Sequence, residues 1–112
     1  IIVDGAMTDL PRPALYGAWH PVEAVAPRCG RKKTVDVVGP VCESGDFLAR
    51  NRRLPPLERG DLLAVGKAGA YCFSMSSQYN SRPRAAEVLL DGRRVILARR
   101  RETLKDVCAA ET

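Results

Sequence analysis

The sequence predicts a small, mostly β domain, a sandwich or barrel with short helices. Three observations support this prediction. The chain has 112 residues, which suits one domain. Short runs rich in β-branched residues alternate with turns that contain Gly or Pro. An Asp91-Gly92 pair between two apolar runs is the typical signal of a tight β-hairpin.

The individual elements follow from residue type and spacing. Strands are expected at residues 1–3, 19–26, 34–41, 61–65, 87–90 and 94–99. Short helices are expected at residues 12–16 and 102–110. Residues 47–57 are expected to be irregular, because Pro55 and Pro56 exclude a regular element there.

The chain starts Ile1-Ile2-Val3-Asp4-Gly5, without a methionine and with strand-forming residues at once. We therefore expect a cut through a longer protein. No apolar run approaches the roughly 20 residues that cross a bilayer, and no signal peptide is recognisable. The expected location is the cytoplasm, without a membrane partner.

The net charge of +5 and a pI near 9.3 raise the question of nucleic acid binding. Three basic clusters carry much of the excess: Arg31-Lys32-Lys33, Arg50-Asn51-Arg52-Arg53 and Arg99-Arg100-Arg101. A nucleic-acid surface usually adds stacking aromatic residues, but these make up 5% of the chain and none lies inside a cluster. We expect solvated loops and strand ends and no nucleic-acid partner. A stand-alone basic binding module is the alternative.

The four cysteines, Cys29, Cys42, Cys72 and Cys108, are widely spaced and form no CxxC pair. With His20 as the sole histidine, we expect no metal site. Nothing in the sequence indicates secretion, so the thiols are expected to be reduced and unpaired. Cys42 is expected at the exposed tip of its turn.

Two pairs of residues are candidates for binding or chemistry. Arg12 and Tyr16 share a face if they lie on a helix, and the pair suits a carboxylate, which Arg binds in a fork. The alternative is an exposed arginine beside a half-buried tyrosine. Cys42 and Glu43 follow a strand end, where a thiol can transfer a proton and a carboxylate can pair with an ammonium group. The alternative is a polar turn with a buried cysteine.

Residues 69–83 form a third candidate, dense in hydroxyls and small side chains. Such a segment is typical of a wall that lines a phosphate or a cofactor. It lacks the lysine of a P-loop and the glycine pattern of dinucleotide-binding folds. A flexible surface loop explains its serine content nearly as well.

Four segments resemble diaminopimelate decarboxylases: MTDLPRPALYGAWH, VVGPVCESGDFLA, AGAYCFSMSSQYNSRPRAAEVL and RRRET. They occur in that family's order and cover nearly all of the chain. The CESGD turn together with the third segment is highly specific. Ornithine and arginine decarboxylases resemble the chain loosely, since their turn typically carries Asp in place of Glu43.

The resemblance implies a pyridoxal-phosphate enzyme of the alanine-racemase-like fold (fold type III), with residues 1–112 as its C-terminal β-domain. In that family a barrel holds pyridoxal 5'-phosphate on a lysine and the β-domain closes the site. The resemblance implies a homodimer, which in that family is obligate for activity because the Cys-Glu turn reaches into the partner's active site. The implied reaction converts meso-2,6-diaminopimelate to L-lysine and CO2. Decarboxylation of another diamino acid, of the ornithine or arginine type, is the alternative.

The resemblance also gives each candidate residue a role. It implies that Arg12 and Tyr16 hold a substrate carboxylate and that Glu43 contacts the distal amino end. Cys42 is the implied proton donor after the carboxylate has left, and Tyr71 touches cofactor and substrate. The barrel and its lysine are missing from this chain, so we expect the chain alone to be inactive and its sheet to be incomplete.

Overall fold

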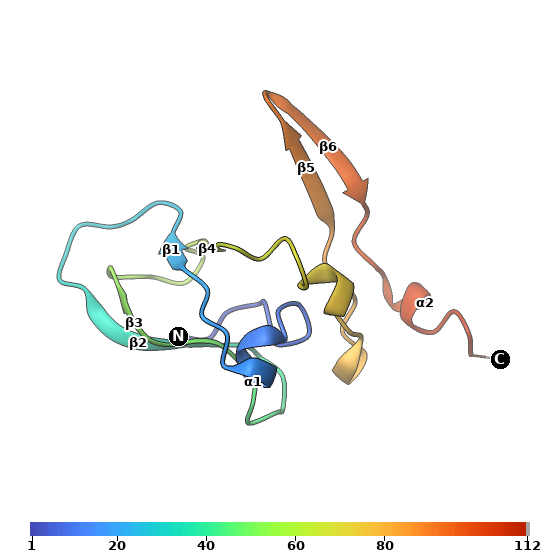
Figure 1. Ribbon diagram of the computed structural model, residues 1–112, viewed down its shortest axis with the longest axis horizontal. Coiled ribbons are helices and arrows are strands. Elements are labelled where there is room, and N and C mark those ends of the chain that lie inside the picture. The colour runs from blue at the N-terminus through green and yellow to red at the C-terminus, as the bar shows by residue number, and fades with distance from the viewer. Residues whose placement is uncertain (112) are drawn as a thin grey trace.

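The chain folds into three two-stranded antiparallel sheets joined by loops (Figure 1). The computed structural model describes residues 1–111. The strands are β1 (Val22–Ala24), β2 (Lys33–Val38), β3 (Phe47–Leu54), β4 (Leu63–Val65), β5 (Glu87–Asp91) and β6 (Arg94–Arg99). The helices are α1 (Arg12–Tyr16) and α2 (Leu104–Val107), with 3₁₀ turns at Phe73–Met75 and Tyr79–Ser81. β1 pairs with β4, β2 with β3, and β5 with β6.

The mostly β content and the presence of short helices are confirmed, but the helix expected at residues 102–110 is reduced to Leu104–Val107. The expected sandwich or barrel is not formed within residues 1–111, because each sheet has two strands and none closes on another. The core is correspondingly small. Its buried members are Leu10, Val22, Val37, Leu48, Ala49, Leu54 and Cys72.

The β2–β3 ribbon contributes four of the seven buried core residues: Val37, Leu48, Ala49 and Leu54. A bulge shifts the register between Val35 and Val37. At the bulge, Asp36 Oδ1 accepts a hydrogen bond of 2.7 Å from the backbone N–H of Asn51, whose φ is +54°. The side-chain acceptor thus satisfies an amide at the irregular point of the ladder.

The expectation that residues 47–57 are irregular is wrong. β3 is a strand over Phe47–Leu54. Pro55 and Pro56 follow its last residue, so their missing N–H groups end the ladder without interrupting it. One basic cluster therefore lies on a strand rather than in a loop.

Other strands are shorter than expected. Residues 1–3 make a single parallel bridge, between Ile2 and Val38 of β2. Gly39-Pro40 ends β2 before residue 41, the end expected from the sequence. The strands expected at 19–26 and 61–65 are reduced to β1 and β4, which pair with each other over three residues each.

The β5–β6 hairpin forms where the sequence predicts it, with Gly92 in the left-handed region at φ +57°. Figure 1 shows it projecting away from the other two sheets. Its apolar side chains are between 43% and 72% exposed: Val88, Leu89, Leu90, Val95, Ile96 and Leu97. Both faces of this ribbon are therefore uncovered in residues 1–111.

Glu102 fixes the segment that follows β6. Its carboxylate accepts hydrogen bonds from Arg84 Nε (2.8 Å), from the Arg84 backbone N–H (2.9 Å) and from Gln78 Nε2 (2.9 Å). These bonds, the Arg84 side chain first among them, lower the pKa of Glu102 to about 2. Directly after it, Thr103 and Asp106 form a capping box that starts α2.

The Glu102 anchor should weaken in acid. The pKa of Glu102 is about 2 in the folded chain against an ordinary 4.5, so its stabilisation is present above pH 4.5 and is lost as the pH falls toward 2. We expect hydrogen exchange at residues 78–84 to accelerate across this window, after correction for intrinsic rates. Glu102→Gln should abolish the pH step, whereas Glu87→Gln, which breaks the exposed Arg99 pair, should retain it. A persisting step in Glu102→Gln would contradict this assignment.

Candidate functional site

Helix α1 presents two of the candidate side chains. Pro13 lies in its first turn, where a missing N–H costs no hydrogen bond, and Gly17 ends it at φ +62°. Arg12 is half-buried, and Tyr16 is 66% exposed. The helix expected at residues 12–16 is confirmed.

Tyr71 has an unusual backbone and lies against Arg12. Its φ is +61°, a left-handed conformation that strains a residue with a bulky side chain. The ring is 62% exposed, and the Arg12 guanidinium carbon lies 5.6 Å from its centroid. This is cation–π distance, so α1 and the segment after β4 meet through these two side chains.

The turn between β2 and β3 carries Cys42 and Glu43 and is closed by backbone bonds. The N–H of Glu43 donates to the carbonyl of Val41 (2.8 Å), and the N–H of Asp46 donates to the carbonyl of Glu43 (3.0 Å). Glu43 Oε1 accepts a bond of 3.2 Å from the N–H of Gly45. Cys42 is exposed, as expected for the tip of a turn.

The three candidate segments converge on one short stretch, which we call loop 6–10 (residues 6–10). Helix α1 follows it directly along the chain. The backbone N–H of Met7 donates to Asp46 Oδ1 at 2.7 Å, which attaches the Cys-Glu turn. The carbonyl of Thr8 accepts a bond of 3.0 Å from the N–H of Ser77, which attaches the hydroxyl-rich segment.

The turn also runs alongside α1. A methyl group placed on Gly45 would lie 3.9 Å from the Cβ of Ala14, at van der Waals contact. Within residues 1–111, however, the side chains of Cys42 and Glu43 have no hydrogen bond to Arg12, Tyr16 or Tyr71. The structure therefore brings Arg12 and Tyr71 into contact and links the others through the backbone.

Sequence reasoning missed two features of this site. Asp46 is 5% exposed, yet in the sequence it is an ordinary acidic residue after a glycine. Cys72, beside Tyr71, is 7% exposed, and burial raises the pKa of its thiol against the opposing charge of Arg12. The sequence carries no signal for the burial of Asp46 or of Cys72.

All four cysteines are free, as expected.

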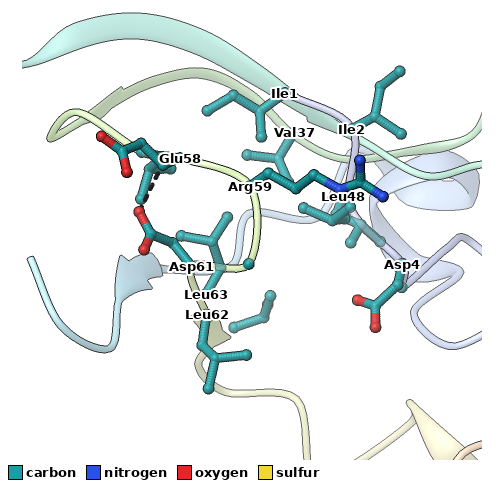
Figure 2. A pocket seen from close by; sticks show the side chains of 15 residues that line it. Ile1, Ile2, Asp4, Val37, Leu48, Glu58, Arg59, Asp61, Leu62 and Leu63 are labelled. Carbon is teal, nitrogen blue, oxygen red and sulfur yellow. Dashed lines mark hydrogen bonds between the residues drawn. The ribbon is translucent and has the colours of Figure 1, made fainter.

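A hollow of about 600 Å³ lies elsewhere, between residues 1–5, residues 57–65 and two residues of the β2–β3 ribbon. Figure 2 shows its mainly apolar wall, which includes Ile2, Val37, Leu48 and Leu63, with Glu58 and Arg59 beside them. None of the candidate site residues lines it. We interpret it as uncovered sheet surface rather than as the functional site.

Residues 1–111 contain no cluster of acidic, histidine or cysteine side chains that could hold a metal ion. Within the same residues, no helix has the length and apolar character needed to span a bilayer. The candidate chemistry of this chain therefore rests on Arg12, Tyr16, Cys42, Glu43 and Tyr71.

Comparison with known proteins identifies the family. Residues 1–69 match the family model described as "Pyridoxal-dependent decarboxylase, C-terminal sheet domain". The chain belongs to this family. Loop 6–10, α1 and the Cys-Glu turn lie inside the matched part of the decarboxylase domain, and Tyr71 lies just beyond it.

Relatives of this chain include diaminopimelate decarboxylases. The enzyme of Pseudomonas fluorescens is 59% identical over 111 residues, which are 99% of this chain and 26% of that protein. A crystal structure from Aquifex aeolicus matches with a TM-score of 0.95 at 50% identity, over 97% of this chain and 27% of that one. Diaminopimelate decarboxylase from Helicobacter pylori, solved with L-lysine, has a TM-score of 0.90 at 45% identity, over 96% and 27%. The chain spans about a quarter of these relatives, and the resemblance seen in the sequence is confirmed.

Proposed function

We propose that this chain is the C-terminal β-domain of an enzyme that decarboxylates meso-2,6-diaminopimelate to L-lysine and CO2. The observation that carries the proposal is the convergence on loop 6–10 of α1, the Cys-Glu turn and the Tyr71 segment. The 59% identity to a diaminopimelate decarboxylase supports it. On this proposal residues 1–112 form one domain of a longer chain.

The side chains suit a substrate with a carboxylate at one end and an amino group at the other. The half-buried Arg12 guanidinium and the exposed Tyr16 hydroxyl would bind the carboxylate. The carboxylate of Glu43, on an exposed turn, would pair with the distal ammonium group. Cys42 Sγ would give a proton to the carbon that has lost its carboxylate.

The family is pyridoxal-dependent, and the residues of this chain fit a supporting role toward that cofactor. Tyr71 is exposed and its backbone has a left-handed φ, so its ring and hydroxyl are free to contact a ring-shaped group. Pyridoxal 5'-phosphate supplies an electron sink for the electrons released when CO2 leaves. We propose that a barrel domain outside this chain holds the cofactor and that Tyr71 adds a contact.

The uncovered hairpin supports the proposal that this domain is completed by other parts of a longer protein. Apolar side chains on both faces of β5–β6 are exposed, which is unusual for a finished surface. We propose that further strands complete a closed sheet, that the enzyme is a homodimer with shared sites, and that it works in the cytoplasm.

A basic nucleic-acid module fits less well. Several arginines are occupied by internal partners: Arg28 with Asp61, Arg84 with Glu102, Arg99 with Glu87, and Arg100 with Asp106. Two others stack on aromatic rings, Arg50 on Phe47 and Arg52 on Trp19. The charge of the first four arginines is therefore partly neutralised by carboxylates, and the other two guanidinium groups pack against aromatic rings. Both arrangements are typical of arginines with a structural role.

The proposed reaction is tested first by assay. The longer protein containing this chain, with pyridoxal 5'-phosphate, should release CO2 from meso-2,6-diaminopimelate and form L-lysine. The 112-residue chain alone should release none above a no-protein control, because on this proposal the lysine that binds the cofactor lies in the barrel domain outside this chain. Faster turnover of ornithine or arginine would replace the proposed substrate, and CO2 release by the chain alone would refute the missing-barrel argument.

Glu43 and Cys42 should affect different kinetic constants. Glu43→Gln removes the charge opposite the distal ammonium and should raise KM roughly tenfold or more. Cys42→Ala removes a proton donor used after binding and should lower kcat by about 10²-fold or more. Steady-state kinetics on the longer protein checks both. Equal effects of the two changes on KM alone would argue against the assigned roles.

The shared-site homodimer predicts complementation. We expect a Cys42→Ala protein and a protein lacking the barrel lysine, each nearly inactive, to regain activity when mixed. Roughly a quarter of the sites in a fully exchanged mixture combine both intact groups in a two-fold dimer. Subunit exchange is verified by native mass spectrometry. No recovery despite exchange would show that the turn serves its own subunit.

A further inference from the structure

Asp46 has a buried carboxylate that forms no salt bridge within residues 1–111. It is 5% exposed. Both of its oxygens accept backbone hydrogen bonds, Oδ1 from Met7 N–H and Oδ2 from Val41 N–H, each at 2.7 Å. Short bonds from N–H groups to an ionised carboxylate are about twice as strong as bonds between neutral groups.

These two bonds connect different parts of the site. The bond to Val41 stays within the Cys-Glu turn and fixes its shape just before Cys42. The bond to Met7 crosses to loop 6–10, 39 residues away in sequence, and so fixes where the turn lies relative to α1. The Asp46 backbone also closes the turn, because its carbonyl accepts a bond of 3.1 Å from Gly39 N–H.

Gly39 leaves the space that this carboxylate occupies. A methyl group at Gly39 would lie 2.5 Å from Oδ1 and 2.7 Å from Cγ of Asp46, closer than side-chain atoms approach one another. The carboxylate is tied at both oxygens and cannot swing away freely. The position of the Asp46 carboxylate at the base of the turn therefore depends on the absence of a side chain at Gly39.

We propose that Asp46 is a positioning residue for the reaction, which fixes the Cys-Glu turn relative to α1 and so sets where Cys42 and Glu43 reach in the homodimer. This inference rests on the proposed function and adds a residue that acts through the turn rather than on the substrate. Proton delivery is efficient only when the donor group is correctly placed, because a displacement of a reacting group by about 1 Å can reduce the rate by about 10²-fold.

Asp36 provides a matched control. Its Oδ1 also accepts a 2.7 Å bond from a backbone N–H, that of Asn51, and it also joins β2 to β3. The bond lies at the exposed bulge of the ribbon and makes no link to loop 6–10. Asp36→Asn therefore removes a bond of the same kind and should leave kcat and KM unchanged.

The test uses the longer protein with its cofactor. In Asp46→Asn one oxygen is replaced by an NH2 group that faces a backbone donor, so one bond is lost. We expect kcat to fall by about tenfold to a hundredfold. Hydrogen exchange should accelerate in peptides covering residues 6–10 and 40–46 together, a readout that needs no activity.

A double variant separates positioning from general stability. If Asp46 acts through Cys42, then Asp46→Asn should reduce kcat little further in a Cys42→Ala background, whereas a purely structural effect would multiply. Multiplying losses, or an Asp46→Asn protein with the kcat and exchange rates of Asp36→Asn, would overturn the proposal.

Gly39→Ala gives a second route that keeps the carboxylate. We expect it to lower kcat by displacing Asp46, and to do so far less in an Asp46→Ala background, where the methyl group has room. This pair decides the question if Asp46→Asn does not fold, and additive effects would then refute the proposal. The proposed function fails separately, if Cys42→Ala retains full activity while Asp46→Asn still loosens both peptides.

Discussion

The backbone N–H groups of Met7 and Val41 both donate hydrogen bonds to the buried carboxylate of Asp46. The arrangement of the site depends on these two bonds. Within residues 1–111, the Met7–Asp46 bond is the one hydrogen bond that joins the Cys-Glu turn to a segment outside the β2–β3 ribbon. Through this bond, the turn is tied to the loop from which α1 emerges. A small domain with a small core can hold a precise site in this way, because short charge-assisted bonds do locally what extensive packing does in larger proteins.

The parts of this fold that follow from local rules could be predicted from the sequence. The Asp91-Gly92 hairpin needs only two residues tolerant of positive φ between apolar runs. α1 needs a proline at its start and a glycine at its end. The expectation of an irregular segment at residues 47–57 is wrong, because a proline removes only its own N–H from the ladder and leaves the residues before it free to pair.

The site was only partly predictable, for a physical reason. Cys42 and Glu43 stand out by residue type, and the resemblance supplies their roles. The burial of Asp46 and the left-handed φ of Tyr71 arise from contacts between segments distant in sequence, which periodicity and propensity do not encode. The closed sandwich or barrel was expected from strand count, but two-stranded ribbons need further strands to close, and residues 1–111 do not supply them.

The bond between Met7 and Asp46 also has a consequence for the order in which the domain folds. The β2–β3 ribbon, with its turn, closes a short loop and is entropically cheap to form early. The Met7 bond spans 39 residues, and the Ile2–Val38 bridge a comparable distance, so both must await collapse of the intervening chain. We therefore expect the reactive turn to be shaped before it is docked, and the contact with loop 6–10 to form late in folding.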